Sequence, residues 1–317
     1  MSDSTASASS PSASANLAAW SEALAGVVQD AGRYIVTIAA RPRQPATGIL
    51  WSAGSETIVL TAEHVVERED DIRVTLPDGT TSVAQIIGRD PSTDLVALRL
   101  ANLPQGTALA AAPVSHQLRV GNLALAIGRP GPDGLRVSFG VVSAIEGPRR
   151  SWQGGEIEGV IYPDLTLYPG FSGGPLVDLA GNVVGLNSSH LTRQNSSAIP
   201  VATLIRVANT LVTHGKVRRG YLGIGTQQVP LSPALAQSAG LSQETALLIV
   251  SVEAGSPAEQ AGLLIGDQLV GINGQPVPDV EGLRSRLGSE PLGQAVALKL
   301  LRGGAPVEMS VTLGERP

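Results

Sequence analysis

The stretch Gly170-Phe171-Ser172-Gly173-Gly174-Pro175-Leu176 is the most informative part of this sequence. It places a serine among glycines, and glycine lacks the Cβ atom that would keep backbone or ligand away from the hydroxyl. A serine hydroxyl is a weak nucleophile near neutral pH until a neighbouring base takes its proton. The stretch therefore predicts a reactive serine if a histidine and a carboxylate elsewhere in the chain can join it.

Two upstream motifs supply such partners. His64 lies in Thr61-Ala62-Glu63-His64-Val65, and Asp94 lies in Ser92-Thr93-Asp94-Leu95-Val96. An imidazole titrates near neutral pH, so His64 can take the proton of Ser172 and return it to a leaving group. Asp94 can accept the other ring N–H and fix the tautomer. The spacing predicts that His64 and Asp94 lie in one β-barrel and Ser172 in a second.

Composition narrows the class of protein. The chain has 317 residues, enough for two domains, and 43% of them are hydrophobic. It carries a net charge of −5 and no basic stripe, so nucleic acid is not an expected partner. There is no cysteine, and no histidine pair has the spacing of metal ligands, so we expect no disulfide, metal or other cofactor. No apolar run is long enough for a membrane span, and no leader is evident. As written the chain reads as cytoplasmic, or as exported if the start site is misassigned.

The order of segments predicts a mostly β protein. Residues 1–16 are rich in Ser and Ala and are expected to form a disordered arm, followed by a short amphipathic helix over 17–31. Short apolar runs separated by Gly, Pro and Asp turns then predict two sets of strands. The strands are expected at 34–38, 57–60, 72–76, 83–87 and 95–100, then at 123–127, 137–145, 159–162, 176–178 and 183–186, with a closing helix at 201–212.

A smaller unit follows residue 215. Residues 247–252 and 268–272 read as strands, and 295–301 with 307–313 read as a hairpin around Arg302-Gly303-Gly304. Residues 255–263 contain a short capped helix, and residues 280–287 contain a second helix. The pattern predicts a smaller β-rich domain with two helices.

The combination of motifs resembles the HtrA/Deg (DegP-like) family of serine peptidases over roughly Gly32 to Leu313. The three motifs above come in the same order, and Arg219-Gly220-Tyr221-Leu222-Gly223-Ile224 with Ser256-Pro257-Ala258 and Ile272-Asn273-Gly274 resemble a PDZ domain. The resemblance implies a chymotrypsin-like double β-barrel over 17–215 and a PDZ domain, a small β-barrel with two helices, over 216–317. It also implies a serine endopeptidase that cleaves unfolded or misfolded proteins, and a possible homotrimer joined through N-terminal segments, in which Tyr34 is a candidate contact.

The resemblance assigns further roles. The backbone N–H groups of Gly170 and Ser172 would form an oxyanion hole, Leu167 would line a pocket for an aliphatic side chain, and Asn187 with Ser188 would pair with the substrate backbone. In the PDZ domain, a peptide C-terminus would bind at the carboxylate loop and the facing helix. The residues concerned are Tyr221, Leu222, Gly223, Ile224, Leu283 and Leu287.

Three alternatives stay open at this stage. Phe171 stands where the family usually has Asn, and it is either buried without effect or holds the oxyanion loop in an inactive form. The segment 188–197 is shorter than the usual pocket wall, so a latent enzyme or a non-proteolytic scaffold or chaperone is also consistent with the sequence. Gly170-Phe171-Ser172-Gly173-Gly174 matches the Gly-x-Ser-x-Gly elbow of α/β-hydrolases, where a helix would follow the serine, but Pro175-Leu176-Val177-Asp178 predicts a hairpin there.

Overall fold

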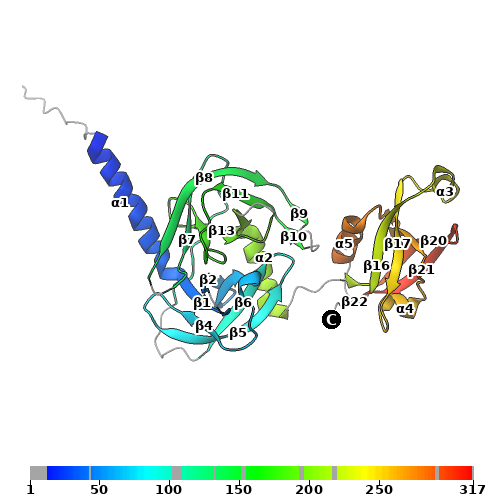
Figure 1. Ribbon diagram of the computed structural model, residues 1–317, viewed down its shortest axis with the longest axis horizontal. Coiled ribbons are helices and arrows are strands. Elements are labelled where there is room, and N and C mark those ends of the chain that lie inside the picture. Colours follow the sequence, from blue (N-terminus) through cyan, green and yellow to red (C-terminus); the bar gives the residue numbers. More distant parts are fainter. Residues whose placement is uncertain are drawn as a thin grey trace, which may run out of the picture. The chain divides into compact units, whose positions relative to one another are not determined.

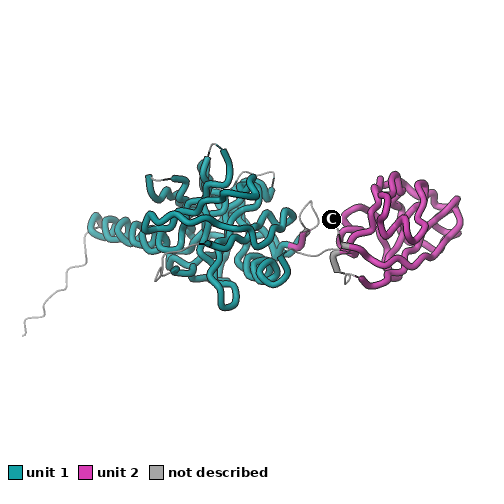
Figure 2. The backbone as a smooth tube through the Cα atoms, turned by 90° about the horizontal axis from the view of Figure 1, so that it is seen from below, with its two compact units in different colours: residues 1–149, 157–216 teal, residues 150–156, 217–317 magenta. Residues whose placement is uncertain are grey.

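A computed structural model describes residues 13–42, 44–101, 109–131, 133–150, 155–192, 196–215, 220–289 and 293–315. The chain divides into two compact units, one formed by residues 1–149 and 157–216 and the other by residues 150–156 and 217–317 (Figure 2). The main division falls between residues 216 and 217, and residues 150–156 of the predicted first domain group with the second unit. Across the described ranges, no helix is long and apolar enough to cross a membrane.

The first unit begins with helix α1, which spans Ala13–Ala31 and leads through a 3₁₀ turn at Gly32–Tyr34 into the first strand (Figure 1). Residues 1–12 of the predicted arm lie outside the described residues, but residues 13–16 are helical because alanine extends the helix at low cost. Tyr34 is buried within its own unit and its hydroxyl donates to the carbonyl of Gly181 at 2.8 Å. Tyr34 is therefore not available for the contact between subunits that the resemblance suggested.

Six strands close into the first barrel in the order β1-β2-β3-β6-β5-β4. Each neighbouring pair is antiparallel, and the residues of β1, the last five of β3 and the first four of β6 are buried, apart from the partly buried Ala39. The turn after β3 carries His64, and the turn before β6 carries Asp94. The strands are β1 Ile35–Ala39, β2 Ala46–Ala53, β3 Glu56–Ala62, β4 Ile72–Thr75, β5 Thr81–Asp90 and β6 Leu95–Ala101.

Six further strands close into the second barrel in the order β11-β14-β13-β12-β7-β8. Its core contains Phe171, Leu176 and Val184, and helix α2 (Val201–His214) follows the last strand. The loop that carries Ser172 runs directly into β12. The strands are β7 Leu123–Gly128, β8 Arg136–Glu146, β11 Val160–Asp164, β12 Pro175–Val177, β13 Val183–Ser188 and β14 Ser197–Pro200, and the short β9 (Arg149–Arg150) pairs with β10 (Glu156–Ile157) outside the barrel.

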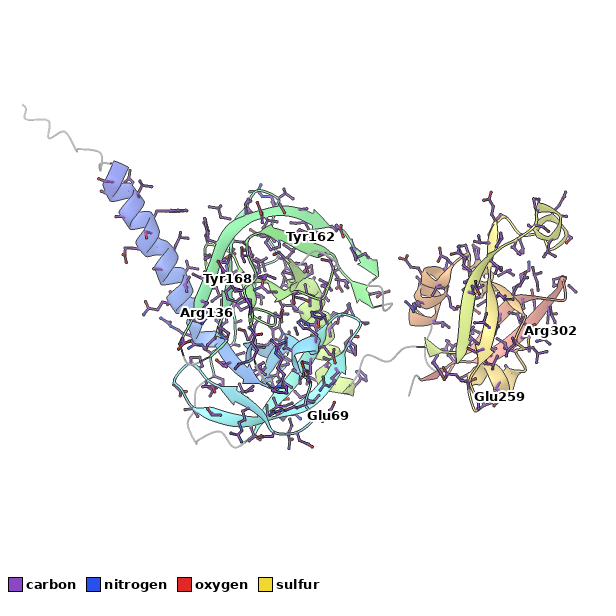
Figure 3. All side chains as sticks on the ribbon, in the orientation of Figure 1. Glu69, Arg136, Tyr162, Tyr168, Glu259 and Arg302 are labelled. Carbon is purple, nitrogen blue, oxygen red and sulfur yellow. The ribbon has the colours of Figure 1, made fainter. Side chains whose placement is uncertain are left out.

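The second unit is built on one sheet with the strand order β16-β17-β18-β20-β21. Its core is apolar, and the buried Asp267 carboxylate beside it pairs with Arg302 at 2.7 Å; Arg302 is labelled in Figure 3. The elements are β15 Gly220–Tyr221, β16 Ile224–Pro230, α3 Pro233–Ser238, β17 Thr245–Val252, α4 Pro257–Ala261, β18 Gln268–Ile272, β19 Gln275–Pro276, α5 Val280–Ser289, β20 Ala295–Arg302, β21 Ala305–Thr312 and β22 Gly314–Glu315.

The expected fold class is confirmed, since the chain forms two closed six-stranded barrels followed by a sheet with few helices. Among the described α-helices and the strands longer than two residues, β2, β14, β16 and α3 were not predicted from the sequence. Strand β2 is buried on both faces, so it lacks the alternation by which a half-buried strand is recognised.

Candidate active site

His64 and Asp94 form the best-defined polar contact of the first barrel. The ring Nδ1 of His64 lies 2.9 Å from each carboxylate oxygen of Asp94, and the backbone N–H of His64 donates to Oδ1 at 3.0 Å. A carboxylate only accepts hydrogen bonds, so Nδ1 carries the proton and Nε2 is left as the basic nitrogen. The His64 side chain is 14% exposed, which keeps the ring accessible from one side.

A tight turn holds Asp94 in an uncommon backbone conformation. Asp94 has φ +56°, a left-handed value that Asp and Asn adopt more readily than other side chains. The buried carboxylate of Asp90 fixes the turn, because it accepts the hydroxyls of Ser92 at 2.5 Å and Thr93 at 2.8 Å. The carbonyl of Asp94 in turn accepts the N–H of Glu63 at 3.1 Å. The backbone thus brings residues 63–64 and 94 together before any side chain contributes.

The glycines that follow Ser172 allow its loop to dock on the first barrel. Gly173 has φ +85°, and a Cβ there would lie 2.0 Å from Thr61 Oγ1 and 2.2 Å from the carbonyl of Thr47. Thr47 Oγ1 also donates to the carbonyl of Gly170 at 2.7 Å, and its backbone N–H lies 3.4 Å from the carbonyl of Ser172. Close packing between the barrels, as well as access to the hydroxyl, therefore requires these glycines.

The residues before Ser172 form a type II turn. Phe171 N–H donates to the carbonyl of Tyr168 at 3.0 Å, with Pro169 and Gly170 at the two central positions and φ +88° at Gly170. Within the described part of the chain, the N–H groups of Gly170 and Ser172 donate to no protein acceptor. Two free donors thus lie on either side of Phe171, beside the serine hydroxyl.

Phe171 is completely buried in the core of the second barrel. Its ring packs edge-on against Tyr168, with 5.5 Å between ring centroids, and it fills the space beside Gly128, where a Cβ would lie 2.7 Å from the ring. The sequence left open whether Phe171 is buried or holds the oxyanion loop in an inactive form, and the structure shows that its ring is buried. The side chain anchors the loop from below and leaves the type II turn intact.

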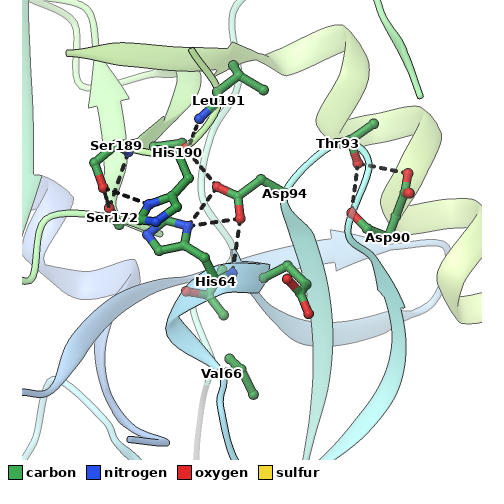
Figure 4. A network of polar contacts seen from close by, with 12 residues as sticks. His64, Val66, Asp90, Thr93, Asp94, Ser172, Ser189, His190 and Leu191 are labelled. Carbon is green, nitrogen blue, oxygen red and sulfur yellow. Dashed lines mark hydrogen bonds and ion pairs between the residues drawn. The ribbon is translucent and has the colours of Figure 1, made fainter. Parts of the chain in front are cut away.

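Ser172 Oγ faces Ser189 in this structure (Figure 4). The two hydroxyl oxygens are 3.1 Å apart, and the N–H of Ser189 approaches Ser172 Oγ at 3.4 Å. Among the described residues, no hydrogen bond joins Ser172 to the ring of His64. In structures without substrate, such catalytic hydrogen bonds are often long and tighten only when substrate binds.

Asn187 and Ser188 differ in how much of their backbone the barrel uses. The N–H of Asn187 donates to the carbonyl of Gly174 at 2.8 Å, its carbonyl accepts from Gly173 at 2.9 Å, and its side chain is fully buried. Both backbone groups of Asn187 are therefore occupied within the barrel. Ser188 is buried opposite Ser197 of β14, and its hydroxyl donates to Asp94 Oδ2 at 2.5 Å, so its side chain orients the carboxylate. Pairing of the Ser188 backbone with a substrate strand stays a prediction.

His190 is the site residue that the sequence did not reveal. Its ring stacks on the ring of His64, with 3.9 Å between centroids and 24° between planes. Burial, His64 and Arg41 lower the pKa of His190 below its usual 6.5, while the charge of Asp94 opposes them. No local pattern distinguishes His190, because the contact depends on a turn that brings it over His64 from another barrel.

The predicted pocket residue Leu167 is partly buried against the core that contains Phe171, on the approach to the serine loop. It lies five residues before Ser172 and packs against the same apolar cluster as Phe171. Across the residues that the structure describes, no group of three or more His, Cys, Asp or Glu side chains is arranged to hold a metal.

The predicted carboxylate loop of the second unit has two free amides. The carbonyls of Leu222 and Gly223 accept from Ala258 at 2.8 Å and from Glu253 at 2.9 Å, whereas their N–H groups donate to no acceptor among the described residues. The side chain of Leu222 is in the core, and the Tyr221 hydroxyl bonds to Glu253.

The predicted side-chain pocket is only partly reproduced. Leu283 is buried in the core of the second unit, which favours its interpretation as a plain core leucine. Ile224 and Leu287 are partly buried beside the same core and are better placed to line a pocket.

The α/β-hydrolase alternative does not fit the connection after Ser172. Residues 175–177 form strand β12, which pairs antiparallel with β13 and β7, so a hairpin follows the serine where the elbow requires a helix.

Comparison with known proteins places these features in a family. Residues 46–186 match the model for a trypsin-like peptidase domain, and residues 220–313 match the model for a PDZ domain. The chain is 36% identical over 270 residues to a probable periplasmic serine endoprotease, DegP-like, of Pseudomonas putida, which covers 83% of this chain and 54% of that protein. A relative of the same name from Chlamydia muridarum is 36% identical over 286 residues, 87% of this chain and 56% of that protein.

Solved structures extend the match to the whole fold. A structure titled HtrA-type protease AlgW with tripeptide aligns with a TM-score of 0.67 and 32% identity, covering 93% of this chain and 97% of that one. The chain spans about half the length of the curated relatives it matches. The chain belongs to the HtrA family of trypsin-like serine endoproteases with a PDZ domain.

Proposed function

We propose that the chain is a serine endopeptidase that uses His64, Asp94 and Ser172 to hydrolyse peptide bonds of unfolded proteins. The observation that carries the proposal is the hydrogen-bonded His64–Asp94 pair beside a serine flanked by two free backbone donors. Family membership supports it, because the relatives are named as serine endoproteases. A non-proteolytic scaffold remains the alternative, favoured by the absence of a Ser172–His64 hydrogen bond among the described residues.

The mechanism follows from the protonation state of the pair. With its proton on Nδ1, His64 presents Nε2 to the hydroxyl of Ser172 once that hydroxyl turns away from Ser189. Ser172 Oγ then attacks the carbonyl carbon, and the proton passes to Nε2 and later to the leaving amine. Asp94 stabilises the imidazolium, and the N–H groups of Gly170 and Ser172 stabilise the oxyanion. Leu167, partly buried beside the core of the second barrel, is proposed to line the pocket for an aliphatic side chain before the cleaved bond.

The first experiment compares the parent with Ser172→Ala on β-casein, followed over time by gel electrophoresis, together with labelling by a fluorophosphonate. The matched control is Ser143→Ala, because Ser143 is an exposed serine of β8 whose hydroxyl bonds only to the carbonyl of Tyr162. We expect cleavage and labelling by the parent and the control, and neither by Ser172→Ala. Equal cleavage by Ser172→Ala refutes the assignment, and absence of both activities in the parent favours the scaffold.

For the second unit, we propose that the free amides of Leu222 and Gly223 bind the carboxylate of a peptide C-terminus, with Ile224 and Leu287 beside its last side chain. The test is fluorescence anisotropy with two peptides of one apolar sequence, one with a free C-terminus and one amidated. The free acid is expected to bind at least tenfold more tightly. Equal affinities, or unchanged affinity after deletion of residues 217–317, would reject carboxylate recognition.

For location and assembly, we propose an exported protein that acts in protein quality control. The matched relatives are named as periplasmic, which favours export over the cytoplasmic alternative. Cell fractionation tests the location, and light scattering tests whether the chain forms the trimer that the family resemblance implies.

A further inference from the structure

The turn that follows β13 covers the candidate active site. Ser188, Ser189, His190 and Leu191 run from the end of the strand across His64 (Figure 4). Leu191 is buried and fixes the turn from one side, whereas His190 is exposed to solvent on the side away from His64. We call residues 188–191 the capping turn.

Hydrogen bonds within the capping turn occupy backbone donors at the end of strand β13. Ser188 Oγ accepts the N–H of His190 and the N–H of Leu191, each at 3.1 Å, while its own proton goes to Asp94. A substrate strand that extended the sheet at the end of β13 would need N–H groups of this kind. In the present form these two are already used.

Side chains of the same turn engage both reactive groups. The hydroxyls of Ser189 and Ser172 share a hydrogen bond of 3.1 Å, and among the described residues Ser172 makes none to His64. His190 stacks on the face of His64 at 3.9 Å, and its Nδ1 lies 3.3 Å from Ser189 Oγ. One short segment thus holds the nucleophile away from the base and covers the base.

We propose that the capping turn is an autoinhibitory element in which His190, stacked on His64 and linked through Ser189 to Ser172, must be displaced before the serine can react. The proposal rests on the assignment of His64 and Ser172 as catalytic residues. Displacement frees the N–H groups of His190 and Leu191, so binding of an extended substrate itself favours the open form.

The stability of the closed form of the capping turn is expected to depend on pH. The charged groups that act on His190 are His64, Asp94 and Arg41, and their balance together with burial lowers its pKa in the closed form. A ring in solvent titrates near 6.5, so protonation favours the open form. The cap is therefore fully stable above about pH 6.5 and weakens as pH falls through the lower pKa of the closed form.

The kinetic test follows the rate of fluorophosphonate labelling of Ser172 in four full-length proteins. These are the parent, His190→Ala, His190→Phe and the control His116→Ala, which removes an exposed histidine outside the site. Loss of the stacked ring should increase the rate of labelling about two- to tenfold at pH 8. This factor is the one expected when a single aromatic contact that stabilises the closed form is removed. His190→Phe keeps a flat ring and should stay near the parent rate, as should His116→Ala. A rate for His190→Ala equal to or below that of the parent overturns the proposal.

A second measurement does not depend on activity. The chain has four histidines, so their ring ¹³C signals can be titrated by NMR in the Ser172→Ala protein and assigned by single substitutions. The pKa of His190 should lie below 6.5, and it should rise toward that value when the substitution His64→Ala is added. A His190 pKa that is the same in both proteins overturns the cap. If no protein is labelled or cleaves casein, the proposed function fails, and the NMR result still decides whether the cap exists.

Discussion

Replacing Phe171 by alanine tests whether the ring beside the nucleophile is a structural anchor. The side chain is 0% exposed and lies in the core of the second barrel, under the loop that presents Ser172. The alanine variant removes the ring and leaves a cavity between Tyr168 and Gly128, because the surrounding strands can close it only in part.

The size of the effect follows from that burial. Removing a fully buried phenylalanine costs about 3–5 kcal/mol of unfolding free energy. For a unit of roughly 200 residues, each kcal/mol lowers the melting temperature by about 2–4 °C, so the first unit should melt about 6–20 °C lower. The turn above the cavity also loses its anchor, and kcat should fall because the free N–H groups of Gly170 and Ser172 are less well fixed.

Differential scanning calorimetry measures the change, and the transition of the second unit serves as an internal reference in the same scan. The chain has one other phenylalanine, Phe139, which is 42% exposed and meets Trp20 edge-on at 5.7 Å. Phe139→Ala is therefore the matched control and should cost no more than about 1.5 kcal/mol. The packing argument is refuted if Phe171→Ala lowers the melting temperature no more than Phe139→Ala does.

Three further changes have defined outcomes. Asp94→Asn points an amide at His64 Nδ1 and favours the wrong tautomer, so kcat on casein should fall by about 10⁴ with little change in melting temperature; a loss below tenfold would remove Asp94 from the mechanism. Gly170→Ala puts a Cβ 2.5 Å from that of Pro130 at φ +88°, so labelling of Ser172 should slow by about 10²-fold, and an unchanged rate would show that the turn is not needed. In the second unit, the Arg302 guanidinium holds the pKa of Asp267 below its usual 3.8, so this contribution to stability is present above that value and is lost as the pH falls below it. Calorimetry between about pH 5 and pH 3 should show its transition moving to lower temperature, and Asp267→Asn should reduce that dependence.

The sequence was enough to predict the architecture, and the contact between His64 and Asp94 that the motifs suggest is present in the structure. Gly170 and Ser172 lie in one motif, His64 lies in the turn after β3, and Asp94 directly precedes β6. Strands such as β21 alternate apolar and polar residues and are visible in any single sequence. In contrast, β2 is buried along almost its whole length, and the close approach of Gly48 to Ile38 and Val59 has no signature outside the folded barrel.

The contacts around the candidate site were less predictable, because they join segments far apart in the chain. Ser188 and Asp94 are 94 positions apart, yet their side chains share a hydrogen bond of 2.5 Å. The resemblance suggested a backbone role for Ser188 toward substrate, but gave no sign that its side chain would donate a hydrogen bond to Asp94. From the sequence, only the length of the segment around His190 was informative. No feature of that segment predicted that the His190 ring would stack on the His64 ring.

The glycines after Ser172 link the fold to the proposed chemistry. A Cβ at Gly173 would meet Thr61 and Thr47 of the first barrel, and a Cβ at Gly174 would lie 2.3 Å from the carbonyl of Ile127 in the second. The nucleophile is therefore placed by contact between two closed barrels, each of which stabilises its own half of the site. Since His64 and Asp94 are already fixed by backbone bonds within the first barrel, the movable parts are the Ser172 hydroxyl and the turn over it. Activity at such a site can be regulated at that turn with little cost in free energy, because opening the turn changes a few side-chain contacts and leaves both barrels intact.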